Sequence, residues 1–154
     1  MTWSRLPEFA AAYNGYSAVI PYVEYYLNSV MNRVRKQIAV SDPALAETVA
    51  TFVKQETAHS KYHERFNKRL FDAGIEGLRE VVDQVIADLR GLRQTRSLAF
   101  NVAYCAGFEC IATFDARYLY EQCDEFFEGA DPRGANLLLL IPSGTLRFDE
   151  LKLV

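Results

Sequence analysis

Three long segments of this chain carry apolar side chains at alternating three- and four-residue steps, which is the spacing of one face of an α-helix. The stripes occupy residues 20–38, 45–70 and 102–127. Glycine and proline, which punctuate chains made of short strands, number only 8 and 5 among 154 residues. Half of the residues are hydrophobic, enough for a packed core, and the length suits one domain. The sequence therefore predicts an all-α fold in which long helices pack as a bundle.

Residues that favour helix ends mark the boundaries of the predicted helices. Asp42 or Ser41 suits the N-cap of a helix that begins at Pro43, and Gly74 suits its C-terminal stop. Pro21 lies near the start of the first stripe and is expected to open that helix. A shorter helix, whose stripe has no polar interruption, is expected to pack on the outside as a connector. The predicted ranges are about 21–38, 43–72, 76–92 for the connector, and 94–128.

A carboxylate interrupts each of the long stripes, at Glu24, Glu56 and Glu109. His59 lies one helical turn after Glu56 on the same face, and His63 lies one further turn along. A buried carboxylate must be neutralised, paired or bound to metal, because burying it alone costs several kcal/mol. Glutamates combined with Glu-x-x-His on the helices of a bundle are typical of carboxylate metal sites. The pattern predicts a site for divalent iron, manganese or zinc, with His63 as a further ligand or as the partner that orients one.

Other interpretations of the same residues remain open at this level. Glu24 would lie on the surface if the first helix were phased differently, since three nearby tyrosines also favour burial. Glu109 would be neutralised without metal if it paired with Arg117 or with an arginine on another helix. His63 alone is more often a core or surface histidine than a ligand. The joint occurrence of three carboxylates at core positions, with His59 beside one of them, favours the metal site.

Composition excludes several classes of function. The net charge of −3 gives no electrostatic reason to expect nucleic acid or an acidic membrane as a partner. No apolar run approaches the roughly 20 residues that span a bilayer, and the first residues do not resemble a signal peptide. Three cysteines without paired spacing indicate reduced thiols and a cytoplasmic protein. The sequence has neither a glycine-rich phosphate loop nor the context of a nucleophilic triad.

One motif resembles a known family. Gln-Glu-x-x-His-x-x-x-His-x-x-x-Asn, which begins at Gln55, resembles a signature of the bacterial family of predicted metal-dependent hydrolases. The segments around Glu24 and Glu109 are similar to two further segments of that family, and the resemblance extends from about residue 17 to 136. It implies a ferritin-like antiparallel bundle with a small-molecule substrate. It also implies that Glu24, Glu56, His59 and Glu109 are metal ligands and that His63 is a recurrent histidine.

The C-terminal part departs from this resemblance. Members of the family usually continue with a fourth core helix that bears a Trp-His segment and a second Glu-x-x-His. Here a short apolar run at residues 137–141 is followed by Pro142-Ser143-Gly144, and no histidine follows His63. We therefore expect a helical domain over residues 1–136, a divergent tail over 137–154 and no regular fourth core helix. A change of reading frame or a truncation of the gene near residues 137–142 would explain the departure.

The sequence leaves three hypotheses about function. The first is a metal-dependent hydrolase in which the bound metal activates water. The alternative is a non-catalytic or vestigial helical protein that self-associates as a homodimer through the apolar seam that a missing fourth helix would expose. The third is a di-iron enzyme that activates oxygen. The substrate and the number of metal ions are not predicted.

Overall fold

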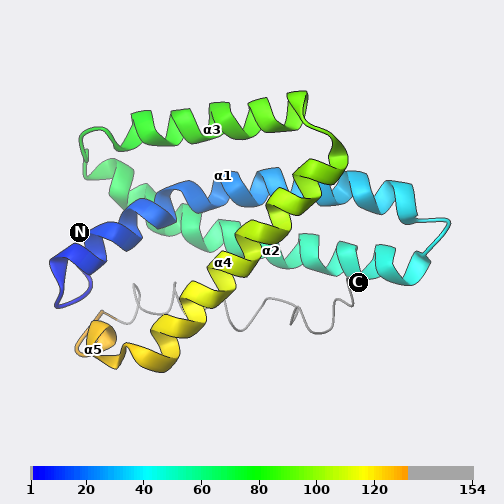
Figure 1. Ribbon diagram of the computed structural model, residues 1–154. Coiled ribbons are helices and arrows are strands. Elements are labelled where there is room, and N and C mark those ends of the chain that lie inside the picture. The colour runs from blue at the N-terminus through cyan, green and yellow to red at the C-terminus, as the bar shows by residue number, and fades with distance from the viewer. Residues whose placement is uncertain (1, 132–154) are drawn as a thin grey trace.

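The computed structural model describes residues 2–131, which fold into helices joined by short turns (Figure 1). No strand occurs in this part of the chain, so the predicted all-α bundle is confirmed. The predicted tail over residues 137–154, with the expected frame change near residues 137–142, lies outside the described residues. The helices are α1 (Pro7–Ile38), α2 (Pro43–Asp72), α3 (Leu78–Thr95), α4 (Leu98–Gln122) and the short α5 (Asp124–Phe127).

Helices α1 and α2 form an antiparallel pair (Figure 1). Ser17, in the first half of α1, hydrogen-bonds to Asn67 near the end of α2. Asn28, three turns further along α1, donates to Thr57, which lies earlier in α2. Residue numbers thus rise along α1 as they fall along α2. This pairing places the middle of α1 against the middle of α2, where the predicted carboxylates lie.

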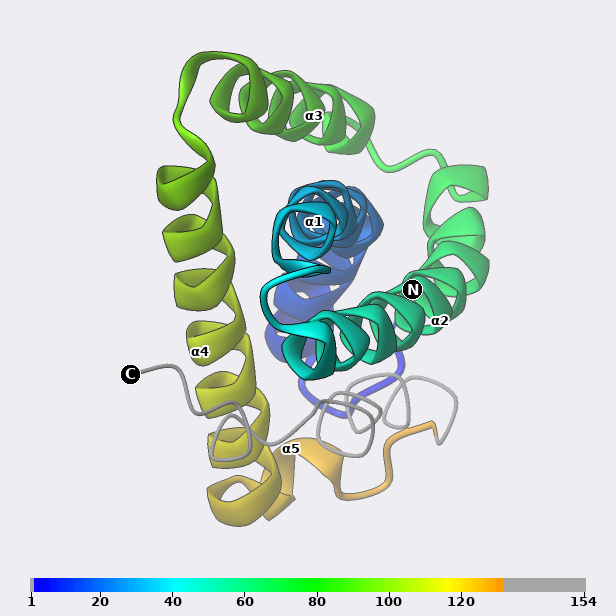
Figure 2. The same ribbon diagram turned by 90° about the vertical axis from the view of Figure 1, so that its right-hand side faces the viewer.

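Helix α1 is the centre of the molecule (Figure 2). Seen along its axis, α1 is surrounded by α2, α3 and α4, and it contacts all three. The main cluster of buried apolar residues draws on these four helices and combines α1 side chains with Phe52, Leu89 and Cys105. Helix α3 buries only Val82 and Leu89, as expected of an outer connector. A central helix with buried side chains on several faces explains why α1 carries polar groups as well as apolar ones toward its neighbours.

The predicted start of the first helix at Pro21 is wrong. Helix α1 begins at Pro7, which occupies the first turn, where a proline needs no hydrogen bond from its nitrogen. Pro21 lies inside the helix and cannot donate to the carbonyl of Ser17, four residues earlier. The side-chain amide of Asn67 donates to that carbonyl at 2.6 Å instead. The interior proline is tolerated because α2 supplies the missing donor.

The ends of α2 are where the sequence predicts them. The Asp42 carboxylate accepts a hydrogen bond from the Leu45 amide at 2.9 Å, as an N-cap does. After α2, Gly74 adopts a φ of +64°, a left-handed conformation that glycine reaches at little cost.

The boundary between α3 and α4 differs from the prediction. Helix α3 continues to Thr95, and α4 begins only at Leu98, because Ser97 caps it by accepting from the Phe100 amide. The predicted last helix is also broken after Gln122, and the short α5 follows. These differences shift helix ends by a few residues and leave the buried position of Glu109 unchanged.

The N-terminal segment packs against the region of α5. The Trp3 indole donates to the Asn14 side chain, and the Ser4 hydroxyl donates to the Phe126 carbonyl at 2.9 Å. Phe9 packs against Trp3 and against the aromatic rings of α5. This second cluster joins the start of α1 to α5 and, through Phe66, to α2. None of the described helices is both long and apolar enough to span a membrane.

Candidate metal centre

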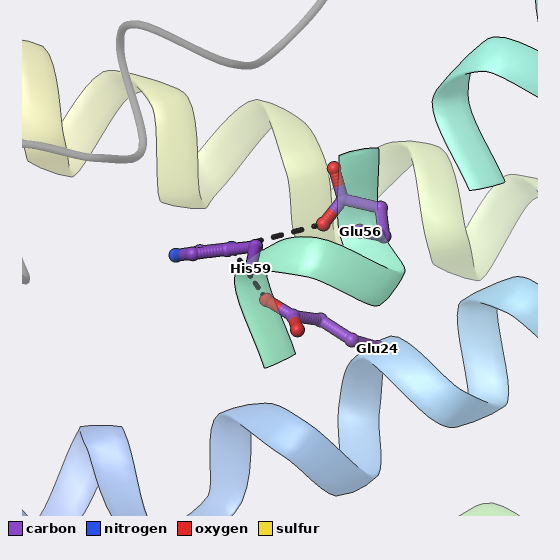
Figure 3. A group of neighbouring side chains, drawn as sticks. All are labelled: Glu24, Glu56 and His59. Carbon is purple, nitrogen blue, oxygen red and sulfur yellow. Dashed lines mark ion pairs between the residues drawn. The ribbon is translucent and has the colours of Figure 1, made fainter. Parts of the chain in front are cut away.

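The antiparallel pair of α1 and α2 brings three of the predicted ligands together (Figure 3). Glu24 projects from α1, Glu56 and His59 project from one turn of α2, and an oxygen of each carboxylate is directed toward His59. Glu24 and Glu56 are 2% and 6% exposed, so both carboxyl groups lie within the bundle. The helical spacing of three residues puts Glu56 and His59 on the same face, and the register of α1 sets Glu24 opposite them.

The three side chains lie at distances at which one ion would contact all of them. His59 Nδ1 is 2.6 Å from Glu24 Oε1 and 3.9 Å from Glu56 Oε2. One donor atom from each residue lies within 4.8 Å of the others. The second oxygen of Glu24, Oε2, is buried and has no hydrogen-bond partner among the described residues. A buried acceptor of this kind calls for a donor or a cation.

The electrostatics of the group indicate a deficit of positive charge. Burial raises the pKa of Glu24 to about 7, although the hydrogen bond and charge of His59 act in the opposite direction. Burial alone lowers the pKa of His59, but hydrogen bonds to Glu24 and Glu56, together with their charges, raise it to about 9. Without another cation, Glu24 therefore retains a proton in part near neutral pH, and His59 stays charged. A divalent ion would replace those protons.

Glu109 lies on α4 and is also buried, at 7% exposure. Burial, followed by the negative charges of Glu56 and Glu24, raises its pKa to about 8. Glu109 therefore feels the charge of the other two carboxylates, but its oxygens are not among the donor atoms that lie within 4.8 Å of one another. The predicted pairing partner Arg117 instead binds Glu121 at 2.8 Å.

His63 is fully buried one turn beyond His59. Its Nε2 lies 3.0 Å from Nε2 of His59, and its Nδ1 lies 2.8 Å from the Ser17 hydroxyl oxygen. That hydroxyl also lies 2.8 Å from Oδ1 of Asn67. Both ring nitrogens of His63 are thus engaged by protein atoms. His63, predicted as a residue of the metal site, therefore contacts the other predicted ligands only through His59 among the contacts of the described residues.

Ser17 and Asn67 do not appear among the predicted site residues. A signal for each was present in the sequence. Asn67 continues the four-residue spacing from His59 to His63, so the three share one face of α2. Ser17 lies four residues before Pro21 and is therefore the residue whose carbonyl loses its helical donor. Recognising it required the knowledge that α1 extends upstream of Pro21.

The donor set fits a divalent transition metal. Nitrogen and oxygen ligands bind zinc at about 2.0–2.2 Å, so two ligands of one ion lie up to about 4.4 Å apart. The donor atoms lie within 4.8 Å of one another, and the His59–Glu24 pair, at 2.6 Å, would open slightly around an ion. Two carboxylates and one imidazole suit iron, manganese or zinc. Three protein ligands would also leave a coordination position for water or substrate, as in catalytic sites.

Comparison with known proteins gives one match. A family model described as "Predicted metal-dependent hydrolase" matches residues 1–140 of this chain. No curated protein and no solved structure matches it. The matched range includes every residue of the candidate metal centre and most of the chain.

Proposed function

This chain belongs to the family of predicted metal-dependent hydrolases, and from that premise we propose that it binds one divalent metal ion at Glu24, Glu56 and His59 and hydrolyses a small-molecule substrate there. The observation that carries the proposal is the convergence, within 4.8 Å, of two buried carboxylates and one partly buried imidazole from two helices. We further propose Glu109, from α4, as a fourth ligand of an ion whose remaining coordination positions hold water and substrate. Iron, manganese and zinc are the candidate ions.

Each residue has a distinct task in the proposed chemistry. A bound divalent ion would act as a Lewis acid and lower the pKa of a bound water molecule, so that the water could lose a proton near neutral pH. Glu56 and His59, which share one turn of α2, would hold the ion, and Glu24 would bind it from α1. The Oε2 atom of Glu24, which has no hydrogen-bond donor in the described part of the chain, is available to accept a proton from the attacking water. The surrounding helices limit access of bulk water, which strengthens these interactions.

Elemental analysis of protein purified without chelator tests the proposal. We expect close to one equivalent of iron, manganese or zinc per chain in the wild type and its loss in Glu56→Ala and His59→Ala. Glu47→Gln, an exposed carboxylate on the same helix, is the matched control and should retain the metal. A wild-type protein free of metal after growth and reconstitution in each ion would contradict the proposal and favour the vestigial alternative.

Activity of the loaded protein separates hydrolysis from oxygen activation. Release of product from ester or phosphoester substrates in the absence of oxygen supports the hydrolase. Oxygen consumption by iron-loaded protein with two equivalents of iron supports the di-iron alternative. The described residues gather one such group of donors, which favours a single ion.

We also propose a homodimer, formed through α4. Ile111 and Phe114 on this helix are 72% and 73% exposed, and Phe114 stacks on Tyr118, itself exposed. The apolar side chains of α4 are distributed around the helix and are not confined to one face, and such a helix is typically covered by protein on more than one side. A second copy related by a two-fold axis would bury these side chains. Sedimentation velocity should give a dimer for the wild type and a monomer for Ile111→Lys with Phe114→Lys; a monomeric wild type would contradict the proposal.

A further inference from the structure

We propose that Ser17, His63 and Asn67 form a chain of hydrogen bonds that fixes the tautomer of His59 and so presents His59 Nδ1 to the metal. These three are positioning residues, because they act through His59. The inference rests on the proposed function, since it assigns the residues that orient one ligand of that site. It follows from the direction in which each hydrogen bond must run, beginning at the backbone of α1.

The carbonyl of Ser17 determines the orientation of the Asn67 side-chain amide. The carbonyl of Ser17 lacks its helical donor because Pro21 has no N–H. A carbonyl only accepts hydrogen bonds, so the atom of Asn67 that lies 2.6 Å from it must be the amide nitrogen. The other amide atom, Oδ1, therefore faces the Ser17 hydroxyl.

The orientation of the Asn67 amide in turn determines where the hydroxyl proton of Ser17 points. Oδ1 of Asn67 only accepts, so the single hydroxyl proton of Ser17 points to it, across 2.8 Å. The Ser17 oxygen then has only lone pairs left for its second neighbour, Nδ1 of His63, at 2.8 Å. His63 must donate that bond. Its proton therefore resides on Nδ1.

The position of the proton on His63 determines which ring nitrogen of His59 carries a proton. His63 is fully buried, and its hydrogen-bond partners Ser17 and His59 carry no negative charge, so a second ring proton would leave a buried charge unpaired and the ring carries one proton only. That proton is on Nδ1, which leaves Nε2 of His63 as an acceptor. The bond of 3.0 Å between the two Nε2 atoms is then donated by His59. With one proton held on Nε2, His59 can give up only its Nδ1 proton to a cation, so Nδ1, 2.6 Å from Glu24 Oε1, is the nitrogen that binds.

The chain ends at a rigid anchor. Ser17 and Asn67 are 2% and 3% exposed, and the final acceptor is a helix carbonyl rather than a mobile side chain. Partners that hold the far nitrogen of a metal-binding histidine typically change metal affinity by about 10–100-fold when they are removed. We expect an effect in that range here.

Nitrogen-15 spectra of the imidazole rings in metal-free protein test the inference directly. The chain has only two histidines, so each ring is readily assigned. We expect neutral His63 with its proton on Nδ1 in the wild type. Ser17→Ala should give a mixture of His63 tautomers, and Ser17→Thr, which keeps the hydroxyl, should restore the wild-type pattern. Ser60→Ala is the matched control, because Ser60 is equally buried and its hydroxyl donates to a backbone carbonyl.

Zinc titration of the same variants gives the second readout. The zinc affinity of Ser17→Ala should fall about 10–100-fold, while Ser17→Thr and Ser60→Ala should stay close to the wild type. In the zinc-bound wild type, the ring nitrogen of His59 that shifts should be Nδ1. Circular dichroism of each variant confirms that it is folded.

The outcomes separate this inference from the proposed function. A wild-type His63 with its proton on Nε2 overturns the inference, whether or not zinc binds. An unchanged His63 tautomer in Ser17→Ala, or an unchanged zinc affinity in that variant, also overturns it. A wild type that shows the expected tautomers but binds no zinc overturns the proposed function and, with it, the assignment of His59 Nδ1 as a ligand.

Discussion

Glu24 is the residue on which the candidate site depends most. One of its oxygens contacts His59, while the other lacks a partner among the described residues. It is 2% exposed, so water does little to stabilise its charge. A buried ion pair of this kind is weak evidence for stability, because desolvation of two charges offsets most of their attraction. Its presence is better explained by the cation that we propose it binds.

Glu24→Gln should lower the pKa of His59 in metal-free protein. Burial lowers the pKa of His59, and only the hydrogen bonds and charges of Glu24 and Glu56 raise it to about 9. Glutamine keeps the shape of the side chain but removes the charge, so burial then opposes Glu56 alone. An NMR titration of the two rings measures the change. An unaltered pKa of His59 would show that Glu24 does not contact it in solution.

At the scale of helices, the sequence predicts a helix end correctly where the residues next to that end determine it. Helix α2 has Asp42 and Pro43 before it and Gly74 after it, and its ends match the prediction. Helix α1 does not match at its start, because an interior proline normally ends a helix. The donor that compensates for Pro21 comes from α2, 46 residues later. A contact between distant segments cannot be found from spacing along one helix.

The residues of the candidate site also differ in whether spacing along one helix could predict them. The apolar stripes placed Glu24, Glu56 and Glu109 at buried positions, and all three are buried. Helical spacing also put His59 on the face of Glu56. The role of Ser17 could not be predicted, since its two hydrogen-bond partners lie on another helix and depend on the register of α1 against α2.

The pairing of Pro21 with Asn67 predicts a coupling between two substitutions. Asn67→Ala should destabilise the protein by about 1–3 kcal/mol, because it leaves buried polar groups of Ser17 unsatisfied. In a Pro21→Ala background the cost should be smaller, since the new amide at position 21 can donate to the Ser17 carbonyl. Urea unfolding of the four proteins of this double-mutant cycle measures the coupling. Additive effects would contradict the account of the interior proline.

At the scale of the whole molecule, the buried groups link folding to pH. The raised pKa values of Glu24, Glu109 and His59, about 7, 8 and 9, mean that the folded protein holds more protons than the unfolded chain. Their stabilising contributions are complete below the unfolded pKa values. Those of the carboxyls are lost from about pH 4.5 upward, and that of His59 is lost between about pH 6.5 and 9. His63, whose pKa is lowered to about 3, acts in the opposite direction, and only below about pH 6.5.

Metal-free protein should therefore become less stable as the pH rises from 6.5 to 9. Each extra proton bound by the folded state costs about 1.4 kcal/mol per pH unit. A saturating divalent ion should reduce this dependence, because it replaces the protons at the site. Urea midpoints at several pH values, with chelator and with zinc, measure both effects. A midpoint that is constant or rises with pH in chelator would contradict the electrostatic description.

The central claim is that α1 and α2 together hold one cation between Glu24, Glu56 and His59. Anomalous X-ray diffraction from a crystal grown with Mn²⁺ tests it most directly, because the method locates the ion itself. We predict a single strong peak within bonding distance of these three side chains, and its loss in Glu24→Gln. No peak at this position in the wild type, with manganese only on surface carboxylates, would contradict the claim.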